Sequence, residues 1–252
     1  MKACRYTWWI LLLHLGTICP AIAQIRLPAL LSSNMVLQQN SDVSLWGWAA
    51  PGEKIKITTS WDHKTDSTLS TRDAKWSLKV HTPSAGGPYS ITFQGNNTIE
   101  LNNIMAGEVW LLSGQSNMEW SALNNNQQAI QEAPQANDPM IRLFHIPKTT
   151  ANAPQEDCPA TWKVCNPEDM KRFSALGYFF GKKLKEELQV PVGLINASWG
   201  GTAAEVWTPE EVVNGDLELK QAAQTLGLTP WWPANPGAAY NAMIAPLTPF
   251  HI

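Results

Sequence analysis

The residues best suited to chemistry lie in segment 110–120, which reads WLLSGQSNMEW. An apolar run leads to Gly114, and Ser116 follows in the next turn. Hydrolases often expose a nucleophilic hydroxyl in this way at the rim of a parallel sheet. If Ser116 begins a helix, nearby main-chain N–H groups favour a developing oxyanion. The alternative is that Ser116 is an ordinary helix N-cap. The segment also differs from a Gly-x-Ser-x-Gly elbow, because residue 118 is methionine.

A second segment of similar character is 196–207, NASWGGTAAEVW. It follows the apolar run 192–197, which we predict to be a buried strand. Gly200 and Gly201 allow the main chain to approach a substrate and offer unobstructed N–H donors. A simple tight turn is the alternative. If both segments follow parallel strands, they lie at the same carboxyl edge of the sheet, where open α/β folds bind ligands.

A serine hydroxyl is a weak nucleophile and needs a base within reach. The histidines beyond residue 23 are His63, His81, His145 and His251. The first two fall in a strand-rich region and are expected at the surface, and His251 is the penultimate residue. His145 has no carboxylate in an Asp-x-x-His frame. None of them fits a general base, so we expect this chain to hydrolyse esters only weakly.

Residues 1–23 have the pattern of a secretory signal peptide. Lys2 and Arg5 precede the apolar stretch 8–15, and Ala21-Ile22-Ala23 is a small-x-small cleavage site. The stretch is too short to span a bilayer, although a membrane anchor is the alternative. We therefore expect export, to the periplasm or outside the cell, with no membrane association after the signal is removed.

Composition excludes several partners and cofactors. Charged residues make up 15% of the chain, the formal net charge is −3, and no basic cluster occurs, which argues against nucleic acid. There is no CxxC and no histidine at ligand spacing, so no metal is expected. Cys158 and Cys165 remain after signal removal and, in an exported protein, favour a disulfide over two free thiols. The 13 tryptophans suit either core packing or stacking against sugar rings.

The chain changes character near residue 105. Before it, short β-forming segments alternate with turns, and they predict an antiparallel β-sandwich over 24–104. These segments are 43–49, 54–61, 75–82 and 89–95. In 75–82, Trp76, Leu78 and Val80 fall on one face.

Beyond residue 105, apolar strands alternate with helices, as in a parallel α/β sheet. The strands are predicted at 108–112 and 192–197. A helix is predicted over 173–188, with its apolar face formed by Phe173, Leu176, Phe180 and Leu184. Another is predicted from Pro209 to about Leu226.

Four segments together resemble the sialate O-acetylesterases of the SGNH (GDSL-like) hydrolase superfamily. They read GQSNMEW, FSALGYFFGKKL, NASWGGTAAEVW and YNAMIAPLTPF, and they occur in the order of the family. The resemblance covers nearly all of the chain after the signal. It implies an α/β protein, with the N-terminal β-sandwich followed by an SGNH-type three-layer α/β/α domain over 105–252.

The resemblance also implies roles for individual residues. Ser116 matches the nucleophile, and its own N–H is one oxyanion donor. Gly201, or as second choice Gly200, matches a glycine whose N–H is another donor. Gln115 and Asn117 are expected to shape the turn, and Glu205 and Trp207 to line the pocket. An acetyl group would pass from the hydroxyl of an O-acetylated sugar or glycan to Ser116 and then to water, without a cofactor.

The chain departs from the family pattern at its end. The family continues into a Gly-Glu-Ser-Asn block, whose Asn completes the oxyanion hole, and an Asp-x-x-His block, which supplies the acid and base. Neither block occurs here. We therefore expect a truncated domain that is inactive or weakly active alone. The alternatives are a non-catalytic exported glycan-binding protein and a gene fragment.

Overall fold

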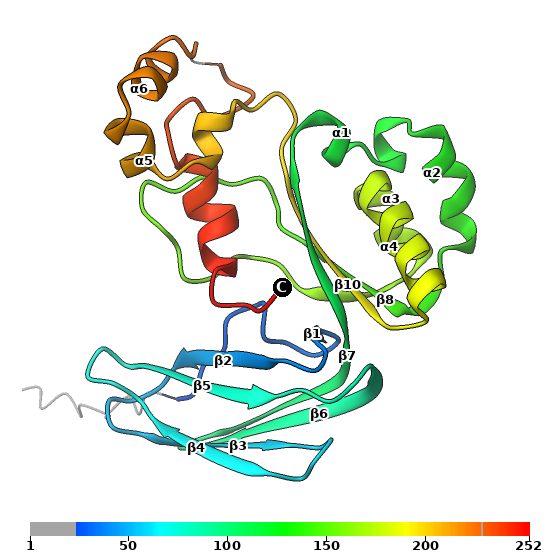
Figure 1. Cartoon of the computed structure of the whole chain (residues 1–252), viewed down its shortest axis with the longest axis vertical. Helices are drawn as coiled ribbons and strands as arrows, with labels where there is room; N and C mark the ends of the chain where they lie inside the picture. The colour runs from blue at the N-terminus through cyan, green and yellow to red at the C-terminus, as the bar shows by residue number, and fades with distance from the viewer. Residues whose placement is uncertain (1–23, 228) are drawn as a thin grey trace, which may run out of the picture.

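The protein combines a strand-rich N-terminal part with an α/β part (Figure 1). This is a computed structural model, and it describes residues 24–227 and 229–252. The predicted signal peptide lies outside the described residues. A large central sheet with helices confirms the expected mixed α/β class.

The N-terminal part contains a two-stranded and a larger sheet. The strands β2 and β5 pair with each other, while β4, β3, β6 and β7 form consecutive antiparallel pairs, and β1 joins β7 in parallel. Buried side chains of both sheets share one hydrophobic core. The predicted alternation in β5 is confirmed, because Trp76 and Val80 are buried. The strands here are β1 (Val36–Gln38), β2 (Asp42–Trp48), β3 (Lys54–Thr59), β4 (Thr65–Leu69), β5 (Lys75–His81) and β6 (Gly86–Gln94).

One long strand, β7 (Thr98–Gly114), connects the two parts. Its first half pairs with β6, whereas residues 108–114 pair with β10 (Val192–Ser198). The strand thus continues through residue 104, where the sequence changes character. Ser116 is consequently presented at the end of a strand that is anchored in both parts of the molecule.

The second part is built on the parallel strands β7, β10 and β8, with β9 antiparallel at the edge. All seven residues of β10 are buried, as expected for a central strand covered on both faces. The elements before β10 are α1 (Ser116–Glu119), η1 (Ala122–Asn124), α2 (Gln127–Glu132), η2 (Ala133–Gln135), β8 (Asp138–His145), β9 (Trp162–Cys165), α3 (Pro167–Arg172) and α4 (Ala175–Leu188). Those after it are η3 (Ala204–Trp207), α5 (Glu210–Gly215), α6 (Leu217–Gln224), η4 (Tyr240–Ile244) and η5 (Ala245–Leu247).

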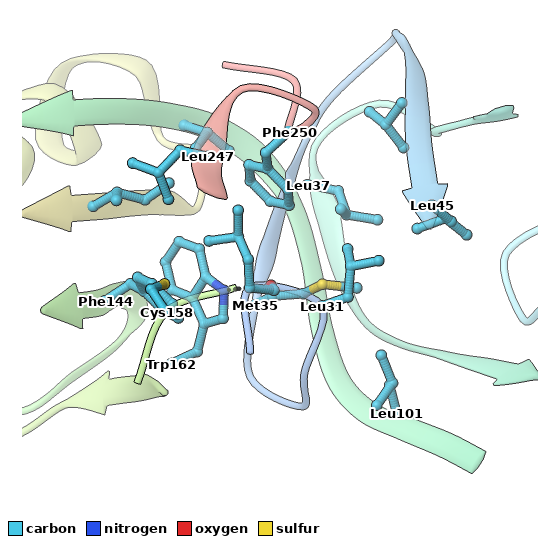
Figure 2. Close-up of a cluster of buried hydrophobic side chains, with 14 of the residues drawn as sticks. Leu31, Met35, Leu37, Leu45, Leu101, Phe144, Cys158, Trp162, Leu247 and Phe250 are labelled. Carbon is cyan, nitrogen blue, oxygen red and sulfur yellow. Dashed lines mark hydrogen bonds between the residues drawn. The ribbon is translucent and has the colours of Figure 1, made fainter. Parts of the chain in front are cut away.

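Side chains on the two faces of this sheet enter different cores. Leu194 packs in the cluster on the side of α4, and the next residue, Ile195, packs in the larger core. The larger core also takes in the C-terminal segment, where Phe250 lies 6.4 Å from the ring of Trp162 (Figure 2). The C-terminal segment thereby covers the sheet face opposite α4.

The predicted apolar face of α4 is wrong at Leu176 and Phe180, whereas Leu184 packs against the core as predicted. Leu176 and Phe180 are 54% and 39% exposed, and the helix buries Ala175, Gly177, Tyr178 and Gly181 instead. A Cβ at Gly177 would collide with Leu112 of β7, and one at Gly181 would lie 2.5 Å from Leu194 Cδ1 of β10. Small residues let the helix approach the sheet closely, which hydrophobic periodicity alone does not indicate. Phe173 is buried, but it precedes the helix.

The predicted disulfide between Cys158 and Cys165 is also wrong, because both are free, buried thiols. Cys158 belongs to the larger core, near Phe144 and Trp162 (Figure 2). Cys165 belongs to the cluster beneath α4, and its thiol contacts the carbonyl oxygen of Ala136 at 3.7 Å. The sheet separates the two clusters, so closeness in sequence does not bring the sulfurs together.

The predicted helix from Pro209 to about Leu226 is two helices. Asp216 has extended backbone angles, and these end α5. Its carboxylate accepts hydrogen bonds from the N–H groups of Glu218 and Leu219 and so caps α6. An aspartate in a helical pattern thus acts here as a helix start.

Candidate active site

The two chemically suggestive loops lie side by side. Strands β7 and β10 are parallel neighbours, and Ser198 is aligned with Gly114. The pairing continues one residue further, where the Trp199 N–H donates to the Gly114 carbonyl oxygen at 3.0 Å. The serine turn and the glycine loop therefore leave the same edge of the sheet.

Ser116 is exposed at this edge and is the first residue of α1. The N-cap is Gln115, so Ser116 is not the N-cap. The Ser116 hydroxyl donates to Gln115 Oε1 at 3.0 Å, and the Ser116 N–H lies 3.5 Å from the same oxygen. Gln115 thus orients the hydroxyl and partly occupies the Ser116 N–H.

Gly200 lies directly against the serine. A Cβ at position 200 would be 3.3 Å from Ser116 Oγ and 2.9 Å from Glu119 Oε2. The Gly200 N–H donates to the Glu119 carboxylate, which also forms an ion pair with Lys148. The absence of a side chain therefore allows the loop to approach the hydroxyl.

The Cβ position of Gly201 faces Trp232. The φ of Gly201 is +82°, a left-handed conformation that favours glycine, and an added Cβ would lie 2.8 Å from the indole of Trp232. Among the described residues, no hydrogen-bond partner is found for the Gly201 N–H. This N–H is available to a ligand, while Trp232 packs on the loop.

A small hollow of about 200 Å³ opens beside the serine. Trp120 forms one wall and is 47% exposed, and its indole N–H donates to the Asn124 carbonyl oxygen at 2.8 Å. That hydrogen bond fixes the ring beside the serine. The lining residues are Ser116, Glu119, Trp120, Asn124 and Gly200.

The other predicted site residues do not line this hollow. Asn117 is exposed on α1. Glu205 and Trp207 lie in η3, where the Trp207 indole N–H donates to Thr202 Oγ1 at 2.8 Å. The carbonyl oxygen of Glu205 accepts from the Gly237 N–H at 3.1 Å. In this structure, both residues support the shape of the loop after Gly201.

His145 reaches the same edge, at the end of β8. It is aligned with Asn196 of β10, and its ring contacts Phe173 edge-on at 6.0 Å. Although part of the side chain is exposed, crowding by neighbouring atoms desolvates the imidazole and lowers its pKa; Glu119 opposes this and Lys148 adds to it. Among the described residues, no histidine hydrogen-bonds Ser116, whose hydroxyl is held by Gln115.

Within residues 24–227 and 229–252, no cluster of three His, Cys, Asp or Glu side chains could hold a metal ion. The same residues include no helix long and apolar enough to cross a membrane.

Sequence reasoning missed several residues of the site. Glu119 and Trp120 follow Ser116 by three and four positions, which is one helical turn, so their motif contained a usable signal. Lys148 and Trp232 are distant in sequence, and no local pattern indicates their contacts.

An exposed serine at the rim of a parallel sheet, with a glycine loop against it, is an arrangement typical of hydrolases that use a serine. Comparison with known proteins is more specific. Residues 106–229 match the family described as carbohydrate esterase, sialic acid-specific acetylesterase. The matched family is the one that the sequence motifs predicted.

Whole-chain similarities agree. The chain is 28% identical over 244 residues to the sialate O-acetylesterases of Pongo abelii and Homo sapiens, covering 88% of this chain and 46% of each relative. It superposes on the crystal structure of a carbohydrate acetylesterase from Xanthomonas citri with a TM-score of 0.78 and 32% identity, covering 90% of this chain and 49% of that one. The chain thus spans about half the length of the relatives that it matches.

Proposed function

We propose that this protein is a carbohydrate O-acetylesterase in which Ser116 is the nucleophile. The observation that carries the proposal is the position of Gly200 beside the exposed Ser116 hydroxyl at one sheet edge, where an added Cβ would lie 3.3 Å from Ser116 Oγ. The substrate class is an O-acetylated sugar, with O-acetylated sialic acid first and acetylated hemicellulose second. The first choice follows the names of the relatives.

The reaction is acyl transfer in two steps. The Ser116 oxygen attacks the acetyl carbon and loses its proton to water. The tetrahedral oxyanion then collapses, the bond between the acetyl carbon and the sugar oxygen breaks, and the sugar oxygen takes a proton from water and leaves as a hydroxyl, so that an acetyl-serine remains. Water then hydrolyses this ester to acetate and regenerates the serine. The Gly201 N–H is free to donate to the oxyanion, whereas the Gly200 N–H would first have to leave Glu119.

The rate should be low, because Gln115 rather than a base accepts the hydrogen bond of the Ser116 hydroxyl. Without a base, the Ser116 hydroxyl is only weakly activated, so its attack on the acetyl carbon is slow. A Ser116-dependent turnover on the order of 1 s⁻¹ or more would contradict this expectation.

Acetate release from O-acetylated sialic acid and from acetylated xylan tests the proposal. We expect slow release that Ser116→Ala abolishes and that the matched variant Ser113→Ala retains, since Ser113 is an exposed serine three residues earlier, on strand β7. Release that is equal in all three proteins would refute the role of Ser116. The ratio of the acetate-release rates from the two substrates identifies the preferred sugar.

We also propose that residues 24–104 form a β-sandwich module and that residues 105–252 form the N-terminal part of an SGNH-type domain. The shared core of the β2–β5 pair and the larger sheet supports the first assignment. The sequence pattern of residues 1–23 supports export. Mass spectrometry of the exported protein, with an N-terminus near Gln24 expected, tests the cleavage.

A further inference from the structure

A cleft of about 550 Å³ lies at the junction of the two parts of the molecule. One wall is the outer face of β2 and β5, another is the loop Pro154–Glu156, and the third is formed by Tyr240 and the segment Ala245–Pro249. None of its lining residues belongs to the hollow at Ser116. Its size falls in the range of about 300–1,000 Å³ that is typical of ligand pockets.

Two tryptophans of β2 line this cleft. Because strand residues alternate between faces, Leu45 and Gly47 point into the core, while Trp46 and Trp48 lie on the opposite face and are half-buried. The Trp48 indole N–H donates to Glu156 Oε2 at 3.2 Å, and the Arg26 guanidinium lies 4.8 Å from the ring centroid. Trp48 is thus a fixed aromatic surface, which loses little conformational freedom when a ligand binds.

Polar groups without partners surround these rings. Among the described residues, neither the Tyr240 hydroxyl nor Ser77 Oγ forms a hydrogen bond, and Ser77 is aligned with Trp46 in the β2–β5 pair. Apolar rings with a few free hydroxyls at the rim match the chemistry of a pyranose, which has an apolar C–H face and peripheral hydroxyl groups.

The charge of the cleft narrows the class of ligand. Lys75 and Glu156 are the charged side chains in its lining, and they pair with each other. The Arg26 guanidinium lies over the Trp48 ring but outside the lining, so the lining residues themselves offer a sugar carboxylate or a phosphate no unpaired cation. The cleft favours an uncharged ligand.

We propose that this cleft is a second, non-catalytic carbohydrate-binding site for a neutral pyranose unit of a glycan. Stacking on Trp48 and Trp46 supplies the apolar contact, and Tyr240 and Ser77 hydrogen-bond the ring hydroxyls. A glycan held there would have a raised effective concentration at the esterase edge of the same molecule. The inference does not depend on esterase activity, because the site takes sugars that carry no acetyl ester.

The test is a titration of the ¹⁵N-labelled chain with lactose, cellobiose and N-acetylneuraminic acid, followed by the indole N–H resonances. We expect saturable shifts of the Trp48 resonance with a neutral disaccharide, at a Kd of about 1 mM or tighter. N-acetylneuraminic acid should bind more weakly.

Variants separate the cleft from the active site. Trp48→Ala should weaken binding, as read from the remaining cleft resonances, by about tenfold or more, which is about 1.4 kcal/mol. Tyr240→Phe keeps the ring, and thus the packing, and should weaken binding severalfold. Trp231→Ala removes an exposed tryptophan outside the cleft, and Ser116→Ala removes the proposed nucleophile; both should bind as the parent does.

Three results would overturn the proposal. The first is the absence of a saturable shift with both neutral disaccharides. The second is binding as tight as the parent's in both single variants, Tyr240→Phe and Trp48→Ala. The third is loss of binding in Ser116→Ala. Tighter binding of N-acetylneuraminic acid than of the neutral sugars would overturn the assignment of ligand charge.

Discussion

The main-chain N–H of Gly200 donates a hydrogen bond to the carboxylate of Glu119, a residue 81 positions earlier in the chain. Glu119 ends the short helix that Ser116 begins, and Lys148 pairs with the same carboxylate. The contact therefore ties the serine turn to the glycine loop. It makes Glu119 a positioning residue for the proposed site.

Glu119→Ala should loosen the glycine loop. The substitution leaves the Gly200 N–H without an acceptor and Lys148 without its partner, and we expect a loss of about 1–3 kcal/mol in the free energy of unfolding. Amide hydrogen exchange at Gly200 should become faster. Glu119→Gln keeps an acceptor oxygen and is the control, so it should retain most of the protection. Unchanged exchange in Glu119→Ala would contradict the positioning role.

The buried face of α4 gives a paired prediction. Gly177→Ala places a methyl group against Leu112 and should lower the free energy of unfolding by about 1–3 kcal/mol, as overpacked cores do. Leu176→Ser alters an exposed neighbour and should change it by about 0.5 kcal/mol or less. Urea unfolding of both variants measures the difference. A larger loss of stability in Leu176→Ser than in Gly177→Ala would mean that Leu176 is buried, as hydrophobic periodicity predicted.

The two thiols should be unreactive in the folded protein. Burial raises the pKa of Cys158 and of Cys165 to about 12, so almost no thiolate is present near neutral pH. We expect both to react with a thiol reagent only after denaturation, without prior reduction. A native protein whose mass is lower by two hydrogens, with no thiols after unfolding, would show instead that the disulfide forms.

The Glu132 carboxylate, held between α2 and α4, should make the stability of the fold depend on pH. Lys182 donates to Glu132 at 2.6 Å and Tyr178 donates at 3.0 Å, and these contacts hold the pKa of Glu132 below its ordinary value of 4.5. A lowered carboxyl pKa stabilises the folded state above the unfolded pKa, and this contribution is lost as the pH falls through the folded value.

Glu132→Gln should therefore be less stable than the parent at neutral pH, by about 1 kcal/mol because the pair is partly exposed. The difference should shrink as the pH falls below about 4.5. Thermal unfolding of both proteins between neutral and acid pH measures it. A difference that does not vary with pH would mean that packing, rather than the charge, is lost.

Much of the fold was accessible from local patterns. The strands near 43–49, 54–61, 75–82, 89–95 and 192–197 lie where alternation and apolar runs placed them. The two loops meet because parallel neighbouring strands end at one edge, which the strand assignments already implied. The α4 face, the break at Asp216 and the thiols were predicted wrongly, because each depends on what the segment packs against.

The sequence by itself determined that a serine and a pair of glycines follow buried strands, and its motifs carried the resemblance to sialate O-acetylesterases. Only the tertiary structure decided that Gly200 is the glycine beside Ser116 and that Glu119 accepts the N–H of the same glycine. It also brought Trp48, Glu156 and Tyr240 around one cleft. Hydrophobic periodicity encodes which face of an element is buried, but contacts between distant segments depend on how closely the backbones approach, and small residues set that distance without leaving a periodic signal.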